Sequence, residues 1–220
     1  MPVFNEQETI EAIIRRVVAV PLRIELIVVD DASTDLTPDI LQRLNRELGF
    51  KLILQPQNAG KGAGLRRGFE DVTGDIVVVQ DADLEYSPEE YPKLIELICQ
   101  GRADVVYGSR FLGRHRVFLF SHYLGNRFLT LVTNLLYNTM LTDMETCYKV
   151  MRTSVLRSME LKQQRFGIEP ELTAKVFKRG YRVYEVPITY DGRGYEEGKK
   201  ITWHDGLVAL WVLIKYRFTE

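Results

Sequence analysis

The chain has 220 residues, of which 45% are hydrophobic and 27% are charged. This balance is typical of one folded domain and excludes a globally disordered chain, a collagen-like fibre and a coiled coil. The 29 basic and 30 acidic side chains give a formal net charge of -1, which argues against a general nucleic-acid-binding protein.

Apolar, β-branched runs alternate with amphipathic stretches along the whole chain. In chain order we expect helix 6–20, strand 24–29, helix 37–48, strand 51–54, helix 59–72, strand 75–79, helix 88–100, strand 103–107, helix 121–140, helix 169–179, strand 182–188 and helix 204–216. This alternation predicts an α/β fold whose mostly parallel sheet is covered by helices on both faces. We see no internal repeat or Pro/Ser-rich linker, so we expect one domain spanning residues 1–220.

Acidic residues follow two of the expected strands. Strand 24–29 is followed by Asp30 and Asp31, and strand 75–79 is followed by Asp81 and Asp83. Ligands of open parallel sheets bind beyond the carboxyl ends of the strands. Two carboxylates as close as Asp81 and Asp83 repel each other unless a divalent cation such as Mg²⁺ or Mn²⁺ lies between them. The pattern predicts a metal site; the alternative is a solvated acidic turn before the helix at 88.

A glycine-rich segment, residues 58–64, opens the expected helix 59–72 and contains Lys61. Its spacing fits neither the Walker A loop nor the dinucleotide-binding fingerprint. Glycines there allow a ligand to approach the backbone, and Lys61 adds a cation near a helix N-terminus, where anions bind. The alternative is an ordinary glycine-rich turn.

Basic residues occur in two later segments, Arg110 after strand 103–107 and Arg193, Lys199 and Lys200 near the end of the chain. Arginine suits phosphate recognition because its guanidinium donates two parallel hydrogen bonds. Taken one at a time, such residues are more often solvated surface charges. Whether these residues bind phosphate can therefore be judged only together with the other motifs.

In combination, six blocks resemble inverting family 2 glycosyltransferases of the GT-A fold, and among them the dolichol-phosphate and polyprenyl-phosphate sugar synthases. The blocks are residues 2–6, 30–35, 58–62, 80–84, 108–110 and 192–200. The resemblance implies a Rossmann-like α/β sheet and transfer of a sugar from a UDP-, GDP- or dTDP-sugar to a polyprenyl or dolichyl phosphate. Members of this family normally carry an apolar strand before the first block, so the first strand is expected to be missing here.

The resemblance also implies roles for individual residues on the donor side. The positions implied to contact the nucleotide are Pro2, Asn5, Glu6, Asp30, Asp31 and Lys61. Asp81 and Asp83 would hold Mg²⁺ or Mn²⁺ on the diphosphate. Glu85 would be a third ligand, at a position where the dolichol branch commonly carries Gln.

On the acceptor side, the resemblance assigns Arg110 to the acceptor phosphate. A mobile loop carrying Arg193 with Lys199 or Lys200 would clamp phosphates, although the related synthases often carry a Gly-Glu-Ser-Lys sequence there. A lipid phosphate is already anionic and needs no general base, whereas a hydroxyl acceptor does. For that case the candidate bases are Asp143, Glu145, Glu169 and Glu171; the alternative for each is a helix-start or surface carboxylate.

Two segments bear on location. Residues 114–141 and 203–220 combine aromatic and aliphatic residues with basic ones, as do helices that rest on anionic lipid surfaces; ordinary core helices are the alternative. The first residues lack the basic start and apolar run of a targeting segment. We therefore expect a cytoplasmic enzyme that can lie on the cytoplasmic face of a membrane. The alternative functions are transfer of the sugar to a hydroxyl acceptor and a non-catalytic nucleotide-binding module. The sequence predicts no oligomeric state.

Overall fold

The computed structural model of the protein describes residues 1–116, 120–192 and 203–220. The elements of the first half are β1 (Pro2–Val3), α1 (Ile10–Ala19), β2 (Ile27–Asp30), α2 (Thr37–Leu48), β3 (Lys51–Leu54), α3 (Lys61–Glu70), β4 (Ile76–Val78), the 3₁₀ turn Pro88–Glu90 and α4 (Tyr91–Cys99). Those of the second half are β5 (Val105–Ser109), α5 (Phe120–Tyr137), β6 (Lys149–Arg152), α6 (Thr153–Arg157), α7 (Ile168–Lys178), β7 (Val183–Pro187) and α8 (Trp203–Phe218). The expected α/β fold is confirmed.

The strands form two sheets. One has the order β1-β2-β3 and is parallel throughout, and the other has the order β4-β6-β5-β7. In the second sheet β5 and β7 are parallel, but β6 runs antiparallel to both β4 and β5. Every expected strand and helix is present, most of them with shifted ends, whereas β1, β6 and α6 were not predicted. The β6 sequence hides its strand character because it begins with a lysine, Lys149, that is fully buried.

The expected absence of the first strand is corrected in part. Pro2 and Val3 form the two-residue strand β1, which pairs in parallel with Val29 and Asp30 of β2. The backbone N–H of Asp31 also donates to the Val3 carbonyl at 2.8 Å. This short strand therefore brings the first block of the sequence beside the carboxyl end of β2.

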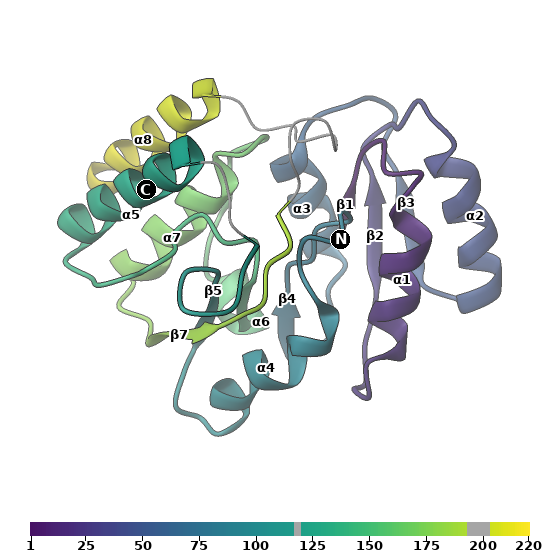
Figure 1. Ribbon diagram of the computed structural model, residues 1–220, viewed down its shortest axis with the longest axis horizontal. Coiled ribbons are helices and arrows are strands. Elements are labelled where there is room, and N and C mark those ends of the chain that lie inside the picture. Colours follow the sequence, from purple (N-terminus) through teal and green to yellow (C-terminus); the bar gives the residue numbers. More distant parts are fainter. Residues whose placement is uncertain (117–119, 193–202) are drawn as a thin grey trace.

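Helices α5, α7 and α8 gather at one end of the molecule, opposite α1 and α2 (Figure 1). α7 lies deepest, and most of its residues are buried. α5 and α8 pack on it and on each other, with the Tyr137 hydroxyl donating to the Leu213 carbonyl at 2.7 Å. Both helices thus have a buried side, as core helices do.

The outer sides of α5 and α8 are apolar and exposed. The exposed large apolar side chains on α5 are Phe120, Tyr123, Leu124, Phe128, Leu131 and Leu135. Those on α8 are Trp203, Leu207, Val208, Trp211, Ile214 and Phe218. Within residues 1–116, 120–192 and 203–220, no helix combines the length and the apolar character that crossing a bilayer requires.

Candidate active site

A cavity of about 620 Å³ lies beyond the carboxyl ends of β2, β4 and β5. Ten residues singled out from the sequence line it: Pro2, Glu6, Asp31, Lys61, Asp81, Asp83, Glu85, Arg110, Glu145 and Glu169. They come from segments scattered over the chain, and the parallel strands bring them together because their carboxyl ends face one crevice. α5 and α8 contribute the wall on the other side, including Asn126 and Trp203.

A chain of buried charges forms the floor of the cavity. The Lys61 amine lies 2.9 Å from the carboxylate of Asp81 and 3.1 Å from Oε1 of Glu169. The other oxygen of Glu169 lies 3.0 Å from the Lys149 amine, which also donates to two backbone carbonyls. Each buried lysine is therefore paired with at least one carboxylate, as buried charges require.

The lysine keeps Asp81 ionised. Burial alone would raise the pKa of Asp81, but attraction to Lys61 and its hydrogen bond hold that pKa below its usual value. Burial alone would lower the pKa of Lys61, but Asp81 and Glu169 raise it well above its usual value. Asp81 therefore presents a negative oxygen pair at the cavity wall.

Asp81 and Asp83 fit a divalent cation only when a substrate supplies further oxygen ligands. Asp81 and Asp83 both line the cavity, and the positive charge beside Asp81 is at present that of Lys61. Mg²⁺ is commonly held by one or two carboxylates together with substrate phosphates. In the ranges that the structure describes, no three His, Cys, Asp or Glu side chains are arranged to hold a metal ion. The donor set matches a two-carboxylate site completed by phosphate oxygens.

Glu85 lines the same cavity as Asp81 and Asp83, and its expected role as a third metal ligand stays a prediction. Its carboxylate accepts a hydrogen bond from the Tyr190 hydroxyl at 2.7 Å. Its backbone N–H donates to Asp83 Oδ1 at 3.2 Å. Glu85 thus fixes the turn that carries Asp83 and ties it to the segment after β7.

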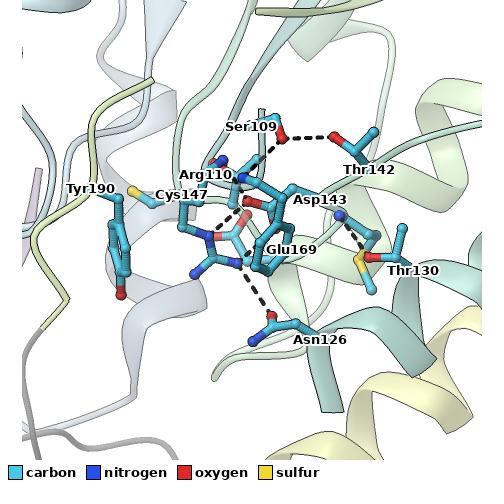
Figure 2. A network of polar contacts seen from close by, with 12 residues as sticks. Ser109, Arg110, Asn126, Thr130, Thr142, Asp143, Cys147, Glu169 and Tyr190 are labelled. Carbon is cyan, nitrogen blue, oxygen red and sulfur yellow. Dashed lines mark hydrogen bonds and ion pairs between the residues drawn. The ribbon is translucent and has the colours of Figure 1, made fainter. Parts of the chain in front are cut away.

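Arg110 is held rigidly by Asp143 (Figure 2). Its Nε and Nη2 atoms each donate to a carboxylate oxygen of Asp143 at 2.7 Å, and Nη2 also donates to Asn126 Oδ1 at 3.2 Å. The guanidinium lies 5.2 Å from the centre of the Tyr190 ring. Although burial alone would lower the pKa of Arg110, Asp143 raises it well above its usual value. Arg110 is therefore a fixed, permanently charged cation in the cavity wall.

Asp143 itself is completely buried and does not line the cavity. Both of its carboxylate oxygens accept hydrogen bonds from Arg110. This geometry contradicts the expectation that Asp143 could act as a general base, because a base must reach the acceptor. The residue is placed to orient Arg110.

The two aspartates after β2 differ in position. Asp31 lines the cavity, and its oxygens accept hydrogen bonds from the Gln55 side chain and from the backbone N–H groups of Ala59 and Gly60, at 2.7 to 2.8 Å. It thereby anchors the glycine-rich segment. Asp30 lies behind the cavity wall, where it accepts hydrogen bonds from Ser33.

Asn5 also lies outside the cavity lining. Its side-chain oxygen accepts the backbone N–H of Thr34 at 2.8 Å, and its own backbone N–H donates to the Ser33 hydroxyl at 2.9 Å. These contacts join the first block of the sequence to the turn after β2. Asn5 and Asp30 therefore shape the loops around the cavity instead of lining it.

The remaining candidate bases differ in their burial and in their hydrogen-bond partners. Glu171 is buried away from the cavity, where it accepts the backbone N–H groups of Lys162 and Gln163 and pairs with Lys175 at 2.8 Å. Glu169 is shared by two lysines. Glu145 lines the cavity, and its Oε1 atom is buried without a hydrogen-bond partner among the described residues. Desolvation by burial raises the pKa of Glu145 to about 7.

Sequence reasoning missed the loop before α7. Arg165 and Phe166 line the cavity, and the backbone of this loop packs against the glycine-rich segment. A Cβ atom on Gly62 would lie 2.5 Å from the Gln163 carbonyl oxygen. The Ala63 N–H donates to the Gln164 carbonyl at 2.8 Å. No local pattern signals these contacts, because they join segments about a hundred residues apart in the chain.

Three further cavity residues were not predicted either: Asn126, Tyr190 and Asp205. They come from α5, from the segment after β7 and from α8. The expected phosphate clamp of Arg193, Lys199 and Lys200 lies outside the residues that the structure describes.

The sequence profile of glycosyl transferase family 2 matches residues 1–159. This chain belongs to glycosyltransferase family 2. It is 32% identical to a dolichol-phosphate mannosyltransferase of Pyrococcus furiosus over 90% of this chain and 57% of that protein. It is 30% identical to an undecaprenyl-phosphate 4-deoxy-4-formamido-L-arabinose transferase of Edwardsiella ictaluri over 90% of this chain and 61% of that protein. The family 2 chain therefore spans less than two thirds of the length of these curated relatives.

Solved structures show the same fold. Glucosyl-3-phosphoglycerate synthase of Mycobacterium tuberculosis, crystallised with Mn²⁺, UDP and phosphoglyceric acid, superposes with a TM-score of 0.77 and 22% identity, covering 100% of this chain and 77% of that one. A complex of the same protein with Mg²⁺ and UDP has a TM-score of 0.73 and 21% identity, covering 98% and 76%. The expected GT-A fold is confirmed by this likeness.

Proposed function

We propose that this family 2 chain transfers a sugar from a nucleotide-sugar donor to a polyprenyl phosphate, with inversion at the anomeric carbon. One observation carries the proposal. A single cavity contains the acidic pair Asp81 and Asp83 and the fixed cation Arg110, and it is walled by two helices with exposed apolar outer sides. A diphosphate, a second phosphate and a lipid chain would each find matching chemistry there.

On the donor side, Asp81 and Asp83 would hold Mg²⁺ or Mn²⁺ against the diphosphate of a UDP-, GDP- or dTDP-sugar. The ion would supply positive charge that stabilises the departing nucleoside diphosphate. Lys61 lies beside Asp81 and adds a further positive charge. The residues proposed to line or shape the nucleotide end are Pro2, Asn5, Glu6, Asp30 and Asp31, and those proposed to clamp the phosphates are Arg193, Lys199 and Lys200.

On the acceptor side, Arg110 would bind the lipid phosphate. A guanidinium has five N–H donors, and those on Nη1 form no hydrogen bond among the described residues, whereas Nε and Nη2 are engaged. Because Asp143 fixes the plane of the guanidinium, the phosphate would be held in one orientation. A phosphate oxygen is a ready nucleophile, so alignment of donor and acceptor supplies much of the rate enhancement.

The lipid chain would leave the cavity between α5 and α8. Most of the residues with which both helices line the cavity are polar or small, including Ser121 and Gly125 on α5 and Gly206 on α8. Both present large apolar side chains on their outer sides. We propose that residues 114–141 and 203–220 rest on a membrane surface, on its cytoplasmic face, where the acceptor phosphate would be within reach of Arg110.

The test is transfer of radiolabelled sugar to undecaprenyl or dolichyl phosphate in detergent, using UDP-, GDP- and dTDP-sugars with Mn²⁺. We expect label in the organic phase for one donor, loss of at least about a hundredfold in Asp83→Ala, and unchanged transfer in Asp39→Ala, a control on α2. Absence of lipid-linked label with every donor would overturn the proposal. Donor binding without turnover under all these conditions would favour a non-catalytic nucleotide-binding module.

Transfer to a hydroxyl group is the second candidate, because one observation favours it. A hydroxyl acceptor needs a general base. Glu145 is a cavity carboxyl with one oxygen that no described residue hydrogen-bonds, and burial raises its pKa to about 7. Label recovered on a soluble glycan instead of the organic phase would support this candidate.

A further inference from the structure

Glu145 is the unexplained group of the cavity. Its Oε1 atom is buried, lacks a hydrogen-bond partner in the described ranges and belongs to a residue that lines the cavity. A buried polar atom left unsatisfied costs about 1–3 kcal/mol. The nearby cations are engaged elsewhere, since Lys149 pairs with Glu169 and Arg110 pairs with Asp143. Among the described residues this oxygen therefore has no partner, and it is available to a molecule in the cavity.

The chain path fixes where Glu145 lies relative to the two halves of the site. At one end of segment 143–147, Asp143 binds Arg110, the proposed acceptor-phosphate residue. At the other end, the Cys147 thiol donates to the carbonyl of Val79 at 3.7 Å, two residues before Asp81, a proposed metal ligand. The charged groups that act on Glu145 come from both sides, namely Lys149 and Glu169 from one and Arg110 and Asp143 from the other. Glu145 thus lies between the donor and acceptor ends.

We propose that Glu145 is a specificity-determining residue that hydrogen-bonds a hydroxyl group of the transferred sugar. This inference rests on the proposed function. In an in-line transfer the sugar lies between the departing diphosphate and the incoming phosphate, which is the position of Glu145. A sugar hydroxyl can both donate and accept hydrogen bonds. It therefore satisfies Oε1 whether the carboxyl is ionised or protonated, and both forms are present near neutral pH.

The consequence is discrimination among donors. A site that must hydrogen-bond a hydroxyl rejects an analogue without it strongly, because the buried polar group is then left unpaired. The nucleotide and the diphosphate would be bound by other residues. Glu145 should therefore affect binding of the nucleotide sugar without affecting binding of the nucleoside diphosphate alone.

The experiment compares Glu145→Leu and Glu145→Gln by titration calorimetry with Mn²⁺, using UDP-glucose against UDP and GDP-mannose against GDP. Leu removes the polar group at similar volume, and Gln keeps a hydrogen-bonding group of the same shape. For the donor that the wild type binds, we expect Glu145→Leu to weaken the nucleotide sugar at least about tenfold and the nucleoside diphosphate less than about twofold. Glu145→Gln should retain most donor affinity. Glu160→Leu, on a side chain that is 81% exposed, is the matched control.

Three outcomes would overturn the inference. Equal donor affinity in wild type and Glu145→Leu would show that no sugar contact exists. Equal weakening of nucleotide sugar and nucleoside diphosphate would show a structural role. Normal donor affinity with lost turnover in Glu145→Gln would make Glu145 a general base. A wild type that binds no nucleotide sugar at all would instead overturn the proposed function, so the two failures are distinguishable.

Discussion

The amine of Lys61 lies 2.9 Å from the carboxylate of Asp81, and the two side chains are only 15% and 19% exposed. The same amine lies 3.1 Å from Glu169. The pair joins the start of α3 to the turn after β4, two segments that approach each other only in the folded chain. It therefore couples the stability of the domain to the charge state of the proposed metal site.

Replacing Lys61 with Met should destabilise the protein strongly. The substitution leaves Asp81 and Glu169 buried without their shared cation, and breaking a buried ion pair costs about 3–5 kcal/mol. Urea unfolding without metal should show this loss, and Mn²⁺ should restore part of it by replacing the missing charge. Lys51→Met is the control, because Lys51 is 49% exposed and its partner Asp71 keeps a second cation, Arg67; exposed pairs are worth less than about 1 kcal/mol. Equal losses in the two variants would contradict the prediction.

Asp143→Asn should weaken acceptor binding through Arg110. The substitution removes one side of a bidentate ion pair that is 11% and 0% exposed, so we expect a loss of about 3 kcal/mol in stability and a higher KM for the lipid phosphate. The donor KM should change little. Asp104→Asn breaks an equivalent pair with Arg182, whose side chain is 56% exposed, and should leave both KM values unchanged. A lipid-phosphate KM that is the same in both variants would reject the assigned role.

The stability gained by Glu145→Gln should depend on pH. Burial raises the pKa of Glu145 to about 7 in the folded state, whereas in an unfolded chain it is about 4.3. The folded state thus holds the proton more tightly, so wild-type stability falls as pH rises from about 4.3 to about 7. Thermal unfolding should show Glu145→Gln to be more stable than the wild type by roughly 4 kcal/mol at pH 8 and by much less at pH 5. A gap that does not change with pH would mean that this carboxyl titrates normally.

Gly62→Ala should displace the loop before α7. The added Cβ atom would lie 2.5 Å from the Gln163 carbonyl oxygen and 2.9 Å from the Arg165 carbonyl oxygen, distances that real structures do not tolerate. Because Lys61 and Arg165 both line the cavity, nucleotide affinity and stability should fall together. Gly74→Ala meets only an ordinary contact at 3.9 Å and serves as the control in calorimetry with nucleoside diphosphates. Normal nucleotide affinity in Gly62→Ala would show that the loop can move at little cost.

Membrane binding should depend on the outer sides of α5 and α8. The exposed side chains Leu135 and Trp211 lie on these helices, and burying them in the headgroup region releases apolar surface from water. The double variant Leu135→Ser with Trp211→Ser should float less well with vesicles of phosphatidylcholine and phosphatidylglycerol. Val18→Ser, which removes an exposed apolar side chain from α1, should float like the wild type. If the wild type and both variants all fail to float, the proposed membrane contact is wrong.

Much of the site follows from the sequence because its chemistry is local to strand ends. Asp31, Asp81 and Arg110 each lie two or three residues beyond the end of a predicted strand, and parallel strands present their carboxyl ends to one crevice. Lys61 stands at the start of a predicted helix, next to glycines that admit close backbone contact. Short-range patterns of this kind predicted the α/β alternation and ten of the residues that line the cavity.

The rest depended on contacts between distant segments. Glu85 has the right spacing for a metal ligand, yet its hydroxyl partner Tyr190 is 105 residues away. Lys149 can begin β6 because Glu169 balances the charge of its buried amine and two backbone carbonyl groups accept its hydrogen bonds. Side-chain direction and charge pairing are settled only when the chain packs, since the cost of burying a charge depends on what surrounds it. The sequence by itself thus determined which groups follow the strands. The tertiary structure decided that Asp143 orients Arg110 and that Oε1 of Glu145 has no hydrogen-bond partner in the part of the chain that the structure describes.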